Sequence, residues 1–403
     1  MKKIVALVLA LVLCLSVVSF AAAEGEKKAV KLGVILLHDE DSTYDLNFIN
    51  GANEAVEILK ADGYDVELTL VRNKAETNEC YEAAKELANS GCNVIFADSF
   101  GHESFILQAA KEFPNVEFCH ATGTMAHTEK LSNFHNAFAA IYQGRYLAGI
   151  AAGMKLNEIK ANGQLKGDAP LMGYIGAFTY AEVISGYTSF YLGAKSVCPD
   201  VTMKVQFTGS WYDEMAEKSA AEALIGAGCD LISQHADSMG APTACEDAGI
   251  PNVSYNGSTY DYCPETFIVS SRINWAPYFV YICDCVAAGL PIDTDWTGDI
   301  ECGSVVLTDV NTDVAADGTV EAIAEATEKL VKGEINVFDT ATESFITVDG
   351  KPMTEYMADV DTDAAYEKDT QVIADGFFHE SEYRSAPYFD VQIDGIELLN
   401  SAF

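Results

Sequence analysis

Basic residues are scarce in this sequence, which has 24 lysines and arginines against 61 aspartates and glutamates in 403 residues, a formal net charge of −37. Proteins that bind nucleic acids or anionic membrane surfaces do so mainly through lysine and arginine, because acidic residues repel phosphates. We therefore expect no nucleic acid and no anionic membrane surface among the partners. The acidic surplus itself indicates only a well-solvated surface.

Common catalytic signatures are also missing. The sequence contains no Gly-x-Ser-x-Gly elbow, no phosphate-binding loop, no Gly-x-Gly-x-x-Gly fingerprint and no His-Glu-x-x-His motif. The seven histidines form no close ligand pair. Two segments with calcium-loop spacing, beginning at Asp309 and Asp359, lack the glycine and the bidentate glutamate that such loops need. We expect no metal, no cofactor and no catalytic residues, and so a protein that is not an enzyme.

The N-terminus has the features of an export signal. Lys2 and Lys3 precede an apolar run, Ile4–Phe20, that is too short for a comfortable membrane span, and Ala21–Ala23 offers a small-residue cleavage site. Residues 1–23 are therefore predicted to be a signal peptide. The mature protein is expected in the periplasm or at the cell surface.

The number of cysteines is compatible with an exported protein but does not determine whether disulfides form. Cys14 follows the bulky run Leu11–Leu13, whereas lipid attachment requires a small residue there, so no lipid anchor is expected at Cys14. Ten cysteines remain after cleavage, with no Cys-x-x-Cys pair. Several fall on or beside predicted core strands, where free cysteine behaves as a small hydrophobic residue. We expect most of these cysteines to be buried thiols. The alternative that one or two disulfide bridges form stays open.

A stretch of about thirty residues occurs twice, and it predicts the architecture. Gly91 and Gly228, like Pro114 and Pro251, are separated by the same 137 residues. Each copy has the pattern of a helix, a glycine stop, a short buried strand, a second helix and a proline before the next strand. Two halves are therefore built on one βαβ plan.

This pattern predicts the α/β class, with two doubly wound βαβ lobes and a ligand cleft between them at the carboxyl ends of the strands. A chain of 403 residues is long enough for two such domains. We expect lobe 1 to comprise residues 30–140 plus about 255–285. Lobe 2 would comprise residues 141–254 plus about 286–403. A small-residue helix that opens at Ala140 and continues to Met154 is expected to pack closely against a neighbouring helix.

Polar and aromatic residues follow the predicted strands at the edge where such folds bind ligands. The candidate ligand-binding residues are Asp41, Tyr44, Asn47, Ser99, Phe100, Phe178, Trp211, Asp237, Asn256, Arg272 and Trp275. A tryptophan there suits a planar ligand, because its ring can stack while a nearby carboxylate or amide reads the ligand edge. Two alternatives stay open: a tryptophan can close a core instead, and aspartate or serine in the first loop can simply cap a helix.

Several segments together resemble a known family. They are Asp41–Asn47, Asp98–Gly101, Gln143–Gly149 and Gly333–Asp339. With the signal peptide, they are similar to the basic membrane protein family of ABC-transporter solute-binding lipoproteins, the purine nucleoside receptor group. Three further segments look nearer to the purine-binding branch, which takes nucleobases: Gly209–Asp213, Gln234–Ser238 and Asn274–Tyr278. The resemblance covers nearly the whole mature chain.

The resemblance implies a type I periplasmic-binding-protein fold whose two lobes close on a purine nucleobase or nucleoside. It also implies delivery of that solute to an ABC permease in the membrane, and we expect a monomer. Residues of the first loop match the family's ligand loop: Asp41, Tyr44 and Asn47. Phe100 matches an aromatic residue near the base, and the second lobe contributes Trp211 and Asp237.

Two positions depart from nucleoside-binding relatives, as the resemblance aligns them. Asn256 stands where those relatives have an aspartate for the ribose, and Arg272 stands where they have a lysine. Loss of that carboxylate favours a free base. The alternatives are a ligand-sensing domain that feeds a membrane receptor, and a binding protein for another solute such as riboflavin or a sugar.

Overall fold

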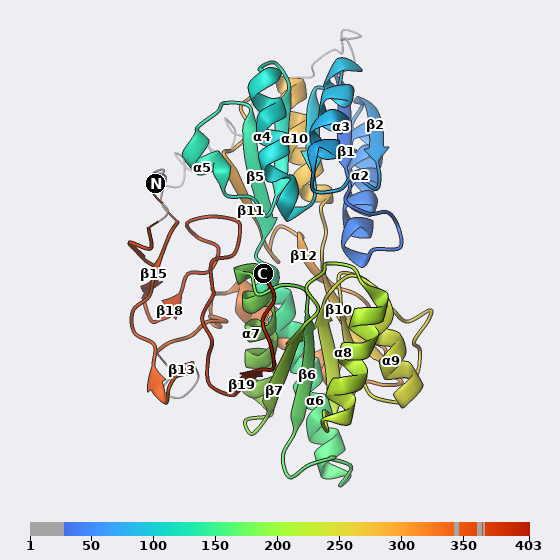
Figure 1. The fold of residues 1–403 in the computed structure, drawn as a ribbon, viewed down its shortest axis with the longest axis vertical. Coiled ribbons are helices and arrows are strands. Elements are labelled where there is room, and N and C mark those ends of the chain that lie inside the picture. Colours follow the sequence, from blue (N-terminus) through green and yellow to red (C-terminus); the bar gives the residue numbers. More distant parts are fainter. Residues whose placement is uncertain (1–27, 342–345, 361–364, 366) are drawn as a thin grey trace, which may run out of the picture.

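The computed structural model describes residues 28–341, 346–360, 365 and 367–403. The predicted signal peptide, with Cys14, lies outside the described residues. The described chain forms two α/β lobes that lie one above the other along the long axis of the molecule (Figure 1). No helix in the described ranges is long and apolar enough to cross a membrane.

The first lobe is built on a parallel sheet with the strand order β11-β5-β4-β3-β1-β2. Its strands are β1 (Ala29–Ile35), β2 (Asp65–Val71), β3 (Val94–Ala97), β4 (Glu117–Ala121), β5 (Phe134–Ala139) and β11 (Asp295–Gly298). Both faces of the sheet are buried, which explains the unbroken apolar runs of its strands. On one face Phe96 packs under α2 (Thr43–Ala61) and α10 (Ala276–Ala288). On the other face Ile95 packs under α3 (Asn78–Asn89) and α4 (Glu103–Glu112).

The second lobe has the strand order β12-β10-β9-β8-β6-β7-β19, and only β12 runs antiparallel to its neighbour. Its strands are β6 (Leu171–Gly176), β7 (Thr202–Phe207), β8 (Leu231–His235), β9 (Asn252–Tyr255), β10 (Phe267–Ile273), β12 (Val305–Leu307) and β19 (Ile396–Leu398). One face of this sheet is covered by α6 (Ile141–Ala161) and α7 (Ala181–Val197), and α11 (Thr319–Val331) packs against α6. The other face is covered by α8 (Glu214–Gly226) and α9 (Gly240–Ala248).

The internal repeat predicted from the sequence is visible as a repeated topology. The strand order β2-β1-β3-β4-β5 of the first lobe recurs as β7-β6-β8-β9-β10 in the second. Gly91 and Gly228 follow equivalent helices, and both have φ of 92°, a conformation that a side chain disfavours. The doubly wound α/β architecture expected from the sequence is confirmed.

Close helix packing accounts for the small residues near Gln143. A Cβ on Gly149 of α6 would lie 2.1 Å from the carbonyl oxygen of Phe190, and one on Gly193 of α7 would lie 2.0 Å from that of Tyr146. Neither contact is sterically possible, so both positions need glycine. The expected close crossing of this helix with a neighbour is present.

The chain crosses between lobes in places that differ in part from the predicted boundaries. Residues 255–285 were expected in the first lobe, but β10 pairs with β9 in the second sheet, where it is the fifth strand of the repeat. The chain returns to the first lobe only for α10 and β11. β11 was expected in lobe 2; only one of its four residues is buried, so it gives little apolar signal.

The last part of the chain covers one side of the second lobe and reaches the first (Figure 1). It forms short antiparallel strand pairs, β13 (Thr347–Val348) with β14 (Lys351–Pro352), β15 (Met357–Ala358) with β16 (Thr370–Gln371) and β17 (Ile373–Ala374) with β18 (Phe377–Phe378). It then adds β19 to the sheet edge beside β7. In the described ranges the ten cysteines are free thiols, nine of them buried and Cys302 exposed.

Candidate functional site

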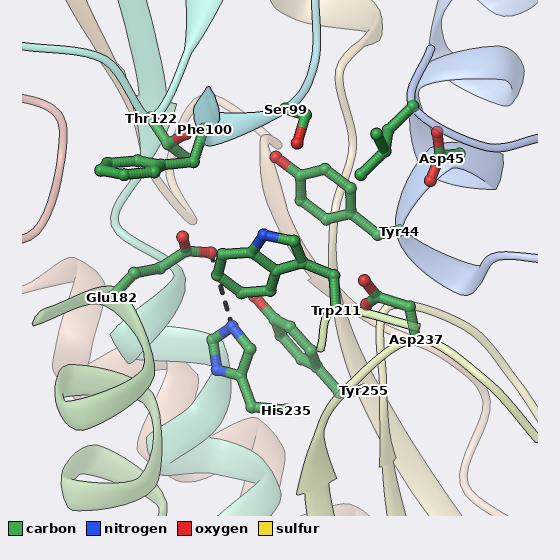
Figure 2. Close-up of a pocket in the computed structure, with 11 residues that line it drawn as sticks. Tyr44, Asp45, Ser99, Phe100, Thr122, Glu182, Trp211, His235, Asp237 and Tyr255 are labelled. Carbon is green, nitrogen blue, oxygen red and sulfur yellow. Dashed lines mark ion pairs between the residues drawn. The ribbon is translucent and has the colours of Figure 1, made fainter. Parts of the chain in front are cut away.

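A pocket lies between the lobes, at the carboxyl ends of strands of both sheets (Figure 2). This is the switch-point edge at which doubly wound folds bind ligands. The cavity has a volume of about 20 Å³, so its walls lie close together in this structure. Its lining residues are Leu37, Tyr44, Asp45, Ser99, Phe100, Thr122, Glu182, Trp211, His235, Asp237 and Tyr255.

The start of α2 places the first-lobe residues. Ser42 caps this helix, since its hydroxyl oxygen accepts from the Asp45 backbone N–H at 3.2 Å and donates to the Asp45 carboxylate at 2.6 Å. The His38 backbone N–H donates to the same carboxylate at 2.7 Å. Tyr44 donates its hydroxyl to the backbone oxygen of Asp98 at 2.8 Å. The cap therefore fixes one acidic and one phenolic side chain at the pocket.

Asp45 and Asp98 form a buried carboxyl pair behind this wall. Burial, and next the charge of Asp45, raise the pKa of Asp98 well above its usual range. Burial alone would raise the pKa of Asp45 too, but hydrogen bonds from His38, Asp98 and Ser42 bring that pKa below its usual value. The two pKa values are thus shifted in opposite directions, so Asp98 takes up a proton before Asp45 as the pH falls.

His235 and Tyr255 line the second-lobe side of the pocket, with ring centroids 4.4 Å apart. Nε2 of His235 lies 3.4 Å from the Glu182 carboxylate (Figure 2). Burial lowers the pKa of His235, and Glu182 opposes that shift only in part, so the imidazole is neutral at pH 7. Gly186 makes room for the ring, because a Cβ there would lie 2.7 Å from Nδ1 of His235.

Asp237 joins the two lobes at the inner end of the pocket. The backbone N–H of Thr43 donates to the Asp237 carbonyl oxygen at 3.1 Å. The side chains of Asn47, Asn256 and Asp237 form a chain, in which Asn47 donates to Asn256 at 3.3 Å and Asn256 donates to Asp237 at 3.4 Å. These contacts connect the start of α2 in the first lobe with loops of the second lobe, so the structure represents the closed form.

Aromatic side chains enclose the rest of the pocket. Trp211 contacts Phe178 edge-on at 5.0 Å, and Phe178 stacks on Tyr180 at 5.1 Å. Tyr180 reaches across to Phe100 of the other lobe at 5.3 Å. Phe100 is 45% exposed and so lies at the rim. The site therefore combines flat apolar surfaces with a few hydrogen-bonding groups, which suits binding of a small planar molecule.

Five of the eleven candidate residues line the pocket: Tyr44, Ser99, Phe100, Trp211 and Asp237. Asn47, Asn256 and Phe178 lie directly behind lining residues. The other three lie elsewhere. Asp41 is exposed in the loop before α2, Arg272 is on β10 outside the lining, and Trp275 is only 1% exposed within the first-lobe core, stacked on Phe48 at 4.5 Å.

Six lining residues were not among the candidates: Leu37, Asp45, Thr122, Glu182, His235 and Tyr255. Asp45 carried a usable signal, since it stands three residues after the capping serine and so faces back toward the preceding strand. His235 and Tyr255 end buried strands, β8 and β9. Glu182 and Thr122 stand in stretches without a distinctive pattern. Among the described residues, no cluster of three or more His, Cys, Asp or Glu side chains could hold a metal ion.

Comparison with known proteins identifies the family. Residues 32–341 match the family described as ABC transporter substrate-binding protein, PnrA-like. The chain belongs to this family. The family and fold are those of extracytoplasmic solute-binding proteins, as the resemblance noted in the sequence implies.

Individual relatives agree with this assignment. A purine-binding protein of Brucella abortus is 36% identical over 70% of this chain and 76% of its own length. A Haloferax volcanii protein, whose name assigns glucose binding provisionally, is 29% identical over 69% of this chain and 66% of its own. The crystal structure of an Aeropyrum pernix ABC transporter solute-binding protein superposes with a TM-score of 0.62, at 17% identity, over 78% of this chain and 94% of that protein. The type I periplasmic-binding-protein fold is confirmed.

The buried carboxyl group of Asp237 is expected to lower the stability of the ligand-free protein at neutral pH. Burial, followed by the charges of Glu217, Asp45 and Glu182, raises the pKa of Asp237 well above its usual value. A raised pKa in the folded state favours folding below the unfolded pKa and loses that contribution as pH rises. Asp237→Asn should therefore be more stable than the wild type near pH 7, by about 1 kcal/mol, with the difference shrinking toward pH 4.

Urea unfolding at several pH values measures this difference. Asp41→Asn is the matched control, because Asp41 is exposed in the loop before α2 and its replacement should change stability by less than about 0.5 kcal/mol. Equal stability of the wild type and Asp237→Asn across the whole pH range would contradict the raised pKa of the buried Asp237 carboxyl.

Proposed function

We propose that this protein is the extracytoplasmic receptor of an ABC importer and binds a purine nucleobase or nucleoside by closure of its two lobes. The observation that carries the proposal is the pocket itself, in which Trp211 offers a flat aromatic face and Asp237, Glu182 and His235 offer hydrogen-bonding groups around it. The purine-binding relative from Brucella supports the same ligand class.

The chemistry of the lining suits the edge of a purine. Ring nitrogens and exocyclic groups of a purine include both donors and acceptors. The carboxyl groups of Asp237 and Glu182 can accept hydrogen bonds, and the hydroxyl groups of Tyr44, Ser99 and Tyr255 can donate or accept. The Tyr255 hydroxyl is buried and has no hydrogen-bond partner among the described residues, so a ligand would satisfy it.

Closure would occur at the segments where the chain passes between lobes. Three connections do so: β5 to α6, β10 to α10 and β11 to β12. They are joined side by side, since Ala140 donates to the Gly298 carbonyl at 2.7 Å and Asn274 donates to that of Ser304 at 2.7 Å. Such a short hinge permits rigid lobes to close around a solute, and the permease would recognise the closed form.

Thermal unfolding of refolded, ligand-free protein tests the proposal. Adenine, hypoxanthine, guanine and their nucleosides are compared with riboflavin, glucose and uridine. A ligand at a hundred times its dissociation constant should add about 2.7 kcal/mol of stability. At least one purine is expected to raise the melting temperature while uridine does not. A shift produced by glucose or riboflavin, with all purines silent, would assign the receptor to another solute.

A further inference from the structure

The C-terminal segment of residues 377–403, named the strap, contacts both lobes. It follows residue 341, where the match to the family ends, so the family match does not account for its contacts. The strap runs along one side of the second lobe and reaches the first lobe (Figure 1). Its contacts with the two lobes differ in kind.

The second lobe holds the strap mainly through burial of apolar side chains. Phe378 and Phe389 are 1% and 0% exposed, in the core that also contains residues of α6 and α7. Strand β19 of the strap pairs with β7. The Asn400 side chain accepts from the Phe207 backbone N–H at 2.7 Å and donates to the Phe207 carbonyl oxygen at 2.9 Å. Detaching the strap would expose this apolar surface to water, so the strap moves with the second lobe.

The first lobe meets the strap at β11 through hydrogen bonds. The Ser385 backbone N–H donates to Oδ2 of Asp295 at 2.7 Å, and the Thr297 hydroxyl donates to the Ser381 backbone oxygen at 3.4 Å. Nε2 of His127 lies 2.8 Å from the same oxygen of Asp295. The Asp295 side chain is only 8% exposed, and Ser385 is buried. A short, buried hydrogen bond to a carboxylate is stronger than a long, exposed one between neutral groups, so Asp295 makes the main contact.

A charge on the strap acts across the same contact. Burial lowers the pKa of Arg384, whereas the negative charges of Asp359 and Asp295 oppose that shift. Asp359 and Arg384 belong to the C-terminal part of the chain, but Asp295 belongs to the first lobe. Attraction between Arg384 and Asp295 therefore adds to the hydrogen bond that joins the strap to the first lobe.

The contact at Asp295 is independent of the pocket. Neither Asp295 nor Ser385 lines it, so their hydrogen bond needs no bound solute. Ser385 moves with the second lobe and Asp295 moves with the first. Opening that separates the lobes must therefore break this hydrogen bond, and the bond favours the closed form.

We propose that the strap holds the two lobes closed in the absence of a ligand, through the hydrogen bond between Ser385 and Asp295. The proposal goes beyond solute binding and does not depend on which solute the receptor takes. A closed form that is already populated reduces the part of the binding free energy that is spent on closure. The strap therefore raises the affinity for any solute that binds the closed form.

Hydrogen exchange of the ligand-free protein, followed by mass spectrometry, tests the strap. The Thr43 backbone N–H donates across the lobes to Asp237, so the exchange rate of this amide reports opening. Asp295→Ala should raise that rate about ten-fold, because it removes a hydrogen bond to a charged acceptor. Amides inside α6 should keep their rates. Solution X-ray scattering of the same variant should show a larger radius of gyration than that of the wild type.

Two further variants make the test specific. Ser385→Pro removes the donor on the strap and leaves Asp295 paired with His127, so it should also raise the exchange rate at Thr43 about ten-fold. Asp394→Ala is the matched control. The Asp394 carboxylate also accepts two hydrogen bonds, but both come from the C-terminal part of the chain, at Thr347 and Gly350. Its loss should change the exchange rate at Thr43 less than about two-fold.

Three results would overturn the proposal. The first is exchange of the wild-type Thr43 amide at the rate of an unprotected amide, which would mean that the ligand-free lobes are open with the strap in place. The second is exchange in Asp295→Ala and Ser385→Pro no faster than in Asp394→Ala. The third is faster exchange throughout the first lobe, which would show that the contact stabilises that lobe and not closure. If Asp295→Ala does not fold, Ser385→Pro alone decides. All of these results concern the ligand-free protein, so failure here leaves the proposed purine function standing.

Discussion

Replacing Trp211 with alanine is expected to weaken purine binding about 100-fold while the protein stays folded. Stacking of a base on an aromatic side chain contributes about 1–3 kcal/mol, and 100-fold corresponds to about 2.7 kcal/mol. Trp211 is only partly buried and packs edge-on against Phe178, so its removal leaves the hydrophobic core of the lobe in place. Titration calorimetry with the purine that binds best measures the loss.

Trp211→Phe is the matched variant for this prediction. A smaller aromatic ring keeps part of the stacking surface, so affinity should fall between that of the wild type and that of Trp211→Ala. Unchanged affinity in the alanine variant would show that the ligand does not lie against this ring, and the stacking geometry would then be wrong.

Replacing Trp275 with alanine should have the opposite profile, with a loss of about 3–5 kcal/mol of stability and little effect on affinity. The Trp275 side chain is 1% exposed and contacts Phe48, Phe96 and Phe138 in the first-lobe core. Its removal would leave a large cavity. Urea unfolding measures the stability, and calorimetry on the folded protein should give a dissociation constant within about three-fold of the wild type.

Trp211→Ala and Trp275→Ala serve as controls for each other. Each is expected to change strongly the property that the other leaves nearly unchanged, so global damage cannot imitate ligand contact. A large loss of affinity in Trp275→Ala without a loss of stability would contradict the assignment of this residue to the core.

The repeated stretch explains why the architecture was predictable. Gly91 and Gly228 mark equivalent helix ends, and the apolar runs after them are strands buried on both faces. The glycines and the apolar runs depend on local backbone conformation and on burial, and both of these determine which residue types occur at a position. Strands β3 and β4 of the first lobe and β8 and β9 of the second follow from them. The four-residue strand β11 does not, because it is short and only one of its residues is buried.

Side-chain direction was harder to predict than strand position. Trp211 and Trp275 both follow strands, β7 and β10, yet Trp211 lines the pocket and Trp275 points into a core. The difference arises because the chain crosses to the first lobe immediately after β10, and α10 then carries Trp275 against α2. A crossing of this kind is a property of tertiary structure and leaves no periodic pattern.

Side-chain direction also distinguishes Asp41 from Asp45. Both aspartates stand in one polar loop and helix start, but the Ser42 cap turns Asp45 inward and leaves Asp41 in solvent. Glu182, at the start of α7, and Thr122, just after β4, line one pocket only because the two lobes are closed. Residues contributed across an interface between lobes are therefore the part of this site that sequence reasoning could not supply.

A crystal structure of the protein with the solute that raises its melting temperature most is the measurement that tests the central claim directly. The account predicts a purine between the lobes, with its ring against Trp211 and its edge bonded to Asp237 or Glu182. A sugar in that position, or a purine bound outside the pocket, would contradict the account.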